Sequence, residues 1–334
     1  MMRPWLWLPA GLAHRLSPWA LQVYSQIKPL QTLTWSPFVW RDLEFTNRLG
    51  LAGGADKDGV NVQAWWTFGP GFLEIGTITP QPQPGNSGKR IDRDVKNSAV
   101  WNRLGFPSRG VEFVASRLKQ LYQPRFTPIF ANVGKNATTP LERAHEDYMA
   151  CMRKLRGLVD AFIINISSPN TQGLRDLLKP ENLQPFLSSI IEDNRQYTRG
   201  QSHTPILLKV SPDMSEDDLA QVLDTSLKVG LDGWVLTNSS IDLRQGLNFP
   251  KEGGVSGKPL SATAKRFLGQ TVAHLGERRG DRLLISVGGV MTPDDVFERL
   301  DMGADLVQVY SALVMSGPKF FREVADHAAI KVKS

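Results

Sequence analysis

The segment 165–170, Asn-Ile-Ser-Ser-Pro-Asn, places two serines between two asparagines within six residues. Asparagine side chains both donate and accept hydrogen bonds, so such a cluster suits a planar ligand rich in N–H and C=O groups. The five histidines, His14, His145, His203, His274 and His327, all lie outside segments of this kind. If the site needs a base, the candidates are therefore Ser168, Lys57 and Lys209. Serine can serve as a base where an ordered relay removes its proton and the developing charge is stabilised.

Seven further polar or glycine-rich segments each follow an apolar run, as segment 165–170 does. They are 53–57, 76–80, 132–136, 209–211, 237–239, 288–289 and 310–311. Burying this many amides, together with Lys57 and Lys209, costs free energy unless a ligand satisfies them. The pattern predicts a polar ligand at the place where these segments meet.

Three elements in the last third of the chain predict an anion site. Gly288-Gly289 lets backbone N–H groups approach an anion closely, Tyr310-Ser311 adds donors, and loop 253–257 supplies further amides. The sequence contains no Walker-type loop and no dinucleotide fingerprint, which argues against ATP and against a Rossmann-type NAD site. The anion site therefore indicates a phosphorylated cofactor of another kind.

The apolar runs that precede these segments indicate the elements that position them. They predict strands at 49–53, 72–79, 129–134, 161–167, 206–211, 233–239, 283–289 and 306–311. The intervening segments are long enough for helices, and near-continuous apolar strands suit a parallel sheet covered on both faces. Eight such units predict an α/β fold, a (β/α)₈ TIM barrel over residues 41–334, with its active site at the carboxyl ends of the strands. A doubly wound open sheet is the alternative.

Residues 1–40 have a different pattern and predict a small helical extension. Ser17 followed by Pro18 predicts an N-cap with proline at the first helical position. Apolar residues then recur at helical spacing up to Ile27. The extension also holds five of the nine tryptophans, Trp5, Trp7, Trp19, Trp35 and Trp40. Tryptophan favours the level of lipid headgroups, so the apolar face either packs on the main domain or contacts a membrane.

The composition limits the kinds of partner and metal site that we expect. The chain of 334 residues has a formal net charge of +6, but no Lys/Arg run with interleaved aromatics, so we expect no nucleic-acid partner. Its one cysteine, Cys151, excludes an intrachain disulfide and a cysteine-based metal site, and we expect no metal.

Seven motifs, in order along nearly the whole chain, resemble those of the class 2 dihydroorotate dehydrogenases. They lie at 55–59, 76–80, 102–106, 132–136, 165–175, 237–239 and 253–257. The resemblance implies a flavoprotein barrel that holds FMN and oxidises dihydroorotate to orotate in de novo pyrimidine synthesis. Class 1 relatives carry cysteine in the loop where this chain has Ser168. The serine therefore indicates class 2, whose acceptor is a membrane quinone.

The resemblance also implies residue roles. Ser168 would be the catalytic base that removes the C5 proton of the substrate. The substrate would be bound by Lys57, Asn102, Arg103, Leu104, Gly105, Phe106, Asn165, Asn170, Asn238 and Ser239, the last of which replaces the family's usual threonine. FMN would be bound by Gly53, Gly54, Ala55, Asp56, Lys57, Thr77, Asn132, Asn165, Lys209, Thr237, Gly257, Gly289, Tyr310 and Ser311. Lys209 would lie beside the flavin, and the last four residues would hold its phosphate.

For residues 1–40 the resemblance implies membrane contact and quinone access, with His14, Arg93 and Tyr310 as quinone-site candidates. We expect a monomeric peripheral membrane protein, on the cytoplasmic face of the inner membrane if the source is bacterial. One alternative is another FMN barrel oxidoreductase with a soluble acceptor, which would not need a tryptophan-rich extension. Another is a non-catalytic membrane scaffold, which the presence of Ser168 and Lys57 argues against.

Overall fold

A computed structural model describes residues 3–121, 123–197, 203–244 and 246–331. Within these ranges eight parallel strands close a barrel in the order β10-β12-β13-β3-β4-β7-β8-β9. They are β3 (Leu49–Asp56), β4 (Phe72–Ile78), β7 (Ile129–Val133), β8 (Ala161–Asn165), β9 (Ile206–Val210), β10 (Gly233–Leu236), β12 (Leu283–Val287) and β13 (Leu306–Val309). The predicted barrel is confirmed, and the open sheet is excluded. β3 ends later than predicted and the other strands end earlier, because their polar ends leave the sheet.

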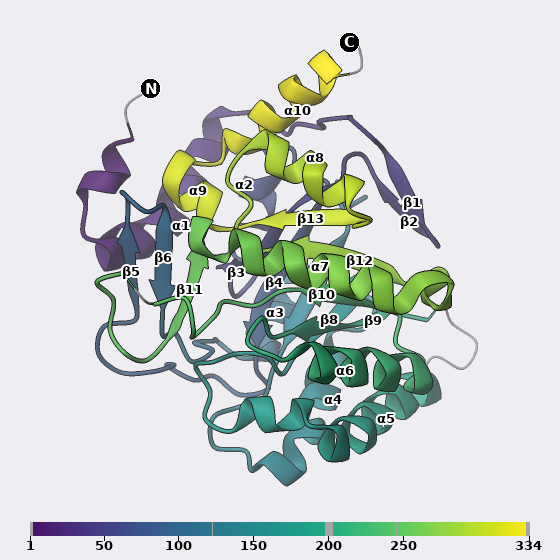
Figure 1. Cartoon of the computed structure of the whole chain (residues 1–334). Coiled ribbons are helices and arrows are strands. Elements are labelled where there is room, and N and C mark those ends of the chain that lie inside the picture. Colours follow the sequence, from purple (N-terminus) through teal and green to yellow (C-terminus); the bar gives the residue numbers. More distant parts are fainter. Residues whose placement is uncertain (1–2, 122, 198–202, 245, 332–334) are drawn as a thin grey trace.

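Helices surround the barrel (Figure 1). They are α2 (Val62–Trp66), α3 (Val111–Leu118), α4 (Ala144–Leu155), α5 (Pro180–Tyr197), α6 (Glu216–Val229), α7 (Ser261–Leu275), α8 (Pro293–Asp301), α9 (Ser311–Ser316) and α10 (Phe320–Lys331). Short 3₁₀ helices η2 (Leu141–Arg143), η3 (Leu174–Leu178), η4 (Lys258–Leu260) and η5 (Gly276–Arg279) lie in the connections. Every residue of β7, β8, β9, β10, β12 and β13 is buried, which explains their nearly continuous apolar sequences.

A hairpin closes the amino-terminal end of the barrel. Its strands are β1 (Phe38–Trp40) and β2 (Leu43–Phe45). The Phe45 ring packs edge-on against Phe72 and Phe130, with centroid distances of 5.8 and 6.2 Å. Trp35 and Trp40 are buried in the same part of the chain. The grouping of all five N-terminal tryptophans as possible lipid contacts is therefore wrong for these two, because they belong to the core.

A three-stranded antiparallel sheet stands beside the mouth of the barrel. It consists of β5 (Ile91–Asp94), β6 (Ala99–Asn102) and β11 (Gly254–Gly257), in the order β11-β6-β5. The segment expected to be a loop of free amides is thus largely a strand, β11, paired with β6. This sheet brings the end of β6 and the end of β11 to the same opening.

The N-terminal extension contains a 3₁₀ helix, η1 (Pro4–Trp7), and a long helix, α1 (Ala10–Ile27). The prediction that a helix begins at Ser17-Pro18 is wrong, because Pro18 lies inside α1. Proline cannot donate to the carbonyl four residues earlier, which here belongs to His14. The hydroxyl of Ser17 donates to that carbonyl at 3.0 Å and so supplies the missing donor.

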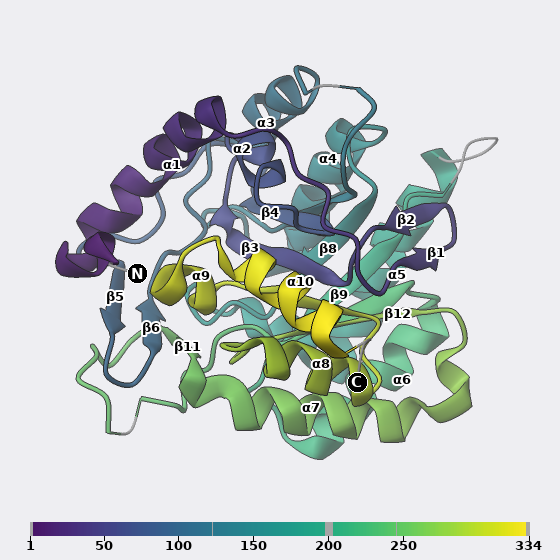
Figure 2. The same ribbon diagram turned by 90° about the horizontal axis from the view of Figure 1, so that it is seen from above.

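Helix α1 lies along the outside of the molecule beside α2 and β5 (Figure 2). One side packs on the main domain, where Tyr24 stacks on Phe68 with a centroid distance of 4.9 Å. A second apolar stripe, comprising Leu16, Trp19, Val23 and Ile27, is exposed, and Trp7 of η1 is 77% exposed. Packing on the main domain is therefore confirmed for one side of α1, while the other side remains uncovered. Within the described ranges, no helix combines the length and the apolar character that crossing a bilayer requires.

Candidate functional site

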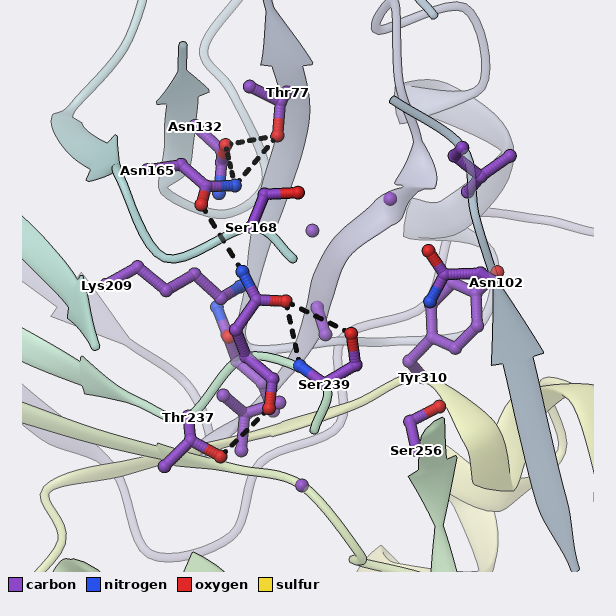
Figure 3. A pocket seen from close by; sticks show the side chains of 18 of the residues that line it. Thr77, Asn102, Asn132, Asn165, Ser168, Lys209, Thr237, Ser239, Ser256 and Tyr310 are labelled. Atoms are coloured by element: carbon purple, nitrogen blue, oxygen red, sulfur yellow. Dashed lines mark hydrogen bonds between the residues drawn. The ribbon is translucent and has the colours of Figure 1, made fainter. Parts of the chain in front are cut away.

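A pocket at the carboxyl end of the barrel encloses about 1000 Å³ of space, part of it open to solvent. This is enough for a cofactor-sized ligand. Most of the predicted site residues line it, and Figure 3 labels several of them together with Ser256, which was not predicted. The predicted residues in the lining are Gly53, Gly54, Lys57, Thr77, Asn102, Leu104, Gly105, Phe106, Asn132, Asn165, Ser168, Asn170, Lys209, Thr237, Asn238, Ser239, Gly257, Gly289, Tyr310 and Ser311.

Three predicted residues of the same motifs do not line the pocket: Ala55, Asp56 and Arg103. The Asp56 carboxylate accepts hydrogen bonds from the backbone N–H groups of Val60 and Asn61, so it shapes the turn after β3. Burial raises the pKa of Asp56 to about 6. The Arg103 guanidinium turns outward and pairs with Glu252 at 2.6 Å. Asp56 and Arg103 therefore support the rim of the pocket from behind.

His14 and Arg93 also lie outside the pocket lining, and both connect it to the N-terminal extension. Lys57 Nζ donates to His14 Nε2 at 3.3 Å and to the Gly54 carbonyl at 2.9 Å. Burial, followed by the nearby Lys57 charge, lowers the pKa of His14 to about 4, so His14 is a neutral acceptor at neutral pH. Arg93 donates to the carbonyls of Trp5 and Leu8 and so fixes the end of η1. Helix α1 is thereby tied directly to a residue that lines the pocket.

The asparagines at the strand ends form one hydrogen-bonded network. Asn165 Nδ2 donates to Thr77 Oγ1 at 3.0 Å and to Asn132 Oδ1 at 3.1 Å. Asn238 Nδ2 donates to Asn165 Oδ1 at 3.3 Å and to Ser167 Oγ at 3.0 Å. Because each amide is oriented by its neighbours, the donors and acceptors that remain free are held in fixed directions.

Ser168 is buried in the loop after β8, next to this network. Its Oγ accepts a hydrogen bond from the backbone N–H of Asn170 at 3.2 Å. The Asn170 side chain donates to Asn102 Oδ1 at 2.9 Å, and its own buried Oδ1 has no partner among the described residues. This free acceptor in the pocket lining suits an N–H group of a ligand.

The sequence argument missed Glu74, the residue on which the pocket floor is built. Glu74 lies in β4 and is completely buried. Its carboxylate accepts hydrogen bonds from Lys209 Nζ at 2.9 Å, Asn132 Nδ2 at 2.6 Å and Gln308 Nε2 at 2.8 Å. Lys209 was expected to face an anion, and the anion that it faces is the carboxylate of Glu74. An acidic residue inside an otherwise apolar strand was the signal that could have revealed it.

Gln308 was missed as well. It lies in β13, is completely buried, and lines the pocket. One end of its amide is fixed by Glu74, and its Oε1 has no partner among the described residues. Gln308 therefore offers a second oriented acceptor to a ligand on the pocket floor.

The far end of the pocket carries donors suited to an anion. Ser256 Oγ and Ser311 Oγ lie 2.9 Å apart. Gly289 has a φ of +71°, and a Cβ at this position would lie 2.2 Å from Cα of Ser261, so only glycine fits. Tyr310 lines the same end, and burial raises its pKa to about 12, so its phenol stays protonated.

Comparisons of this chain with known proteins identify one family. A family model described as dihydroorotate dehydrogenase matches residues 39–330. A dihydroorotate dehydrogenase (quinone) of Thermus thermophilus is 45% identical over 84% of this chain and 79% of its own length. One from Rhodococcus opacus is 38% identical over 100% of this chain and 94% of its own length. The crystal structure of Eimeria tenella DHODH in complex with ferulenol superposes with a TM-score of 0.87 at 28% identity, covering 97% of this chain and 91% of that one.

Proposed function

This chain belongs to the dihydroorotate dehydrogenase family, and we propose the roles that its residues take in the family's reaction. The protein is a class 2 enzyme that oxidises dihydroorotate to orotate in pyrimidine synthesis, with FMN as cofactor and a quinone as electron acceptor. The observation that carries the proposal is the convergence of Ser168 and five asparagine side chains on one pocket.

The pocket fits FMN at both ends. Its floor offers the free Oε1 of Gln308 and the ammonium of Lys209 to the polar edge of a flavin ring. Its far end offers the hydroxyls of Ser256 and Ser311 and the close backbone of Gly289 to a phosphate. FMN held there would supply the acceptor for the hydride from C6 of the substrate and the route by which the electrons reach the quinone.

Ser168 is the base in this proposal. Its hydroxyl proton leaves through an ordered relay, and its Oγ takes the proton from C5 of dihydroorotate as the hydride leaves C6. The N–H of Asn170 already points at that oxygen, so it stabilises negative charge that develops on Oγ. Burial excludes bulk water from the serine, which keeps this stabilisation strong.

The remaining polar residues bind the substrate. Asn102, Asn165, Asn170, Asn238 and Ser239 supply the amide and hydroxyl groups that match the N–H and C=O groups of a pyrimidine ring. The Lys57 ammonium pairs with the substrate carboxylate.

We further propose that residues 1–40 bring the protein to a membrane and admit the quinone. The exposed stripe of α1 and the exposed Trp7 provide apolar area at one surface. His14 links that surface to Lys57, Arg93 fixes η1, and Tyr310 lines the pocket, so these three are the quinone-site candidates. The protein is then a peripheral membrane protein and a monomer, on the cytoplasmic face of the inner membrane in a bacterium.

A stopped-flow experiment tests the site assignment. Holoenzyme mixed with dihydroorotate should bleach the flavin absorbance in a first phase, and a ubiquinone analogue should restore it in a second. An enzyme saturated with FMN whose absorbance does not respond to dihydroorotate would contradict the proposal. If the first phase occurs and the quinone fails to reoxidise the flavin while a soluble acceptor succeeds, the quinone assignment is wrong.

A further inference from the structure

Arg299 is a fully buried cation in α8 that the proposed function does not use. A buried guanidinium is expensive unless a counter-charge compensates it. In the described part of the chain, no carboxylate forms an ion pair with Arg299. The two nearby acids are engaged elsewhere: Asp295 accepts backbone N–H groups at the start of α8, and Glu298 pairs with Lys265 at 2.9 Å. Burial lowers the pKa of Arg299 to about 10, against the weaker opposing effect of these acids.

The hydrogen bonds of Arg299 all go to neutral groups. Nη1 donates to Ser286 Oγ at 3.0 Å, and Nη2 donates to the carbonyls of Gly288 at 3.0 Å and Ser261 at 3.2 Å. Its Nε is buried without a partner among the described residues. These contacts join the loop after β12 to the first residue of α7, at the edge of the pocket where Gly288 and Gly289 line it.

The contact with Gly288 fixes the direction of the next amide. The peptide bond between Gly288 and Gly289 is trans, so its C=O and N–H point to opposite sides. The C=O points at Arg299, and the N–H of Gly289 therefore points away from it. That N–H has no partner within the described ranges. Arg299 thus stands directly behind a free donor at the phosphate end of the pocket.

We propose that Arg299 is the buried counter-charge for the phosphate of FMN and a positioning residue for the Gly289 amide. The proposal rests on the FMN site described above and adds to it the charge that a doubly negative phosphate needs. With Arg299 behind the loop, the anion meets a positive potential without losing its contacts to the hydroxyls and backbone in front.

The test separates phosphate recognition from flavin binding. The full-length chain, stripped of flavin, is titrated with FMN and with riboflavin, which lacks the phosphate, and binding is followed by quenching of flavin fluorescence. Arg299→Gln removes the charge and keeps a donor, whereas Arg299→Lys keeps the charge. Arg266→Gln is the matched control, because Arg266 is an exposed cation on α7, one helix away.

We expect Arg299→Gln to lower the preference for FMN over riboflavin by about tenfold or more while the Kd for riboflavin stays nearly constant. Arg299→Lys and Arg266→Gln should keep the preference of the wild type. An equal loss of affinity for both ligands in Arg299→Gln, or an unchanged preference, would overturn the role of Arg299. If Arg299→Gln does not fold, Arg299→Lys becomes the test variant. It keeps the charge, so a loss of the preference for FMN over riboflavin in this variant would contradict the role of Arg299 as the counter-charge. A wild-type chain that binds riboflavin as tightly as FMN would instead overturn the phosphate site itself.

Discussion

The floor of the pocket and helix α1 place their polar and apolar groups in opposite ways. On the floor, Glu74 is completely buried and holds Lys209, Asn132 and Gln308 at hydrogen-bonding distance. Helix α1 contains no buried residue and turns an apolar stripe toward solvent. The floor is suited to chemistry, because catalysis needs polar groups that are oriented before the substrate arrives. The helix is suited to reversible contact with an apolar phase, which needs uncovered area.

The largest effect is expected for Ser168→Ala, which removes the base from the pocket. The rate of flavin reduction by dihydroorotate should fall by about 10²–10⁴-fold, because the C5 proton loses its acceptor, while orotate binding is largely kept. Stopped-flow absorbance measures the rate. Ser167→Ala is the matched control in the same loop, since it removes an acceptor for Asn238 and a donor to Asn165 but leaves Ser168 in place. Similar rates for the two variants would remove Ser168 from its role.

The next effect concerns the ion pair beneath the site. Glu74→Gln leaves the buried Lys209 charge without its partner and should lower the free energy of unfolding by about 3–5 kcal/mol. Urea denaturation of the holoenzyme measures this difference. In the double variant Glu74→Gln/Lys209→Met the loss should be smaller than the sum of the single losses, because no unpaired charge remains. Strictly additive losses would show that the two side chains do not depend on each other.

A moderate, pH-dependent effect on ligand binding is expected at Lys57, where the pocket meets helix α1. Burial lowers the pKa of Lys57 to about 8, so below that pH the ammonium is charged and binds the carboxylate of the ligand. Above it the amine is neutral, and the Kd for orotate should rise by up to about tenfold per pH unit. Titrations between pH 7 and 10 measure the Kd. Lys57→Gln should bind more weakly and without this pH dependence. A wild-type Kd that does not change across this range would contradict the assignment.

The smallest effect is expected in the N-terminal extension. Trp7→Ala combined with Trp19→Ala should weaken binding to lipid vesicles roughly fivefold, because it removes exposed apolar area. Flavin reduction by dihydroorotate should not change, whereas turnover with vesicle-bound quinone should fall. Val39→Ala, at a 65% exposed position on the hairpin, is the control. Deleting residues 1–40 is a poorer test, since it removes the buried Leu33, Trp35 and Trp40 as well. A loss of flavin reduction equal to the loss of quinone turnover would make the extension structural.

The sequence predicted the barrel and most of its pocket because both depend on local patterns. Apolar runs of strand length define the strands, and a parallel closed sheet brings all their carboxyl ends to one mouth. Asn132, Asn165 and Asn238 could therefore be assigned to one site although they lie far apart in the chain, and the structure places them in one network.

Other features were decided only by tertiary structure. The helix through Pro18 persists because the Ser17 hydroxyl satisfies the carbonyl that proline leaves free. Arg103 lies within a motif of the site, yet it pairs with Glu252, a residue that β11 brings close to β6. Local sequence carries no information on such partners, because they come from distant parts of the chain.

Glu74 and Arg299 show most clearly the difference between what the sequence determines and what tertiary structure decides. The sequence by itself determined that an acid lies within an apolar strand and that an arginine lies within an amphipathic helix. Only the closed barrel decided that Glu74 meets Lys209 from β9, and that Arg299 meets the backbone of Gly288 while no carboxylate of the described residues forms an ion pair with it. The energy of a buried charge depends on every group around it, and that surrounding shell exists only after the chain has folded.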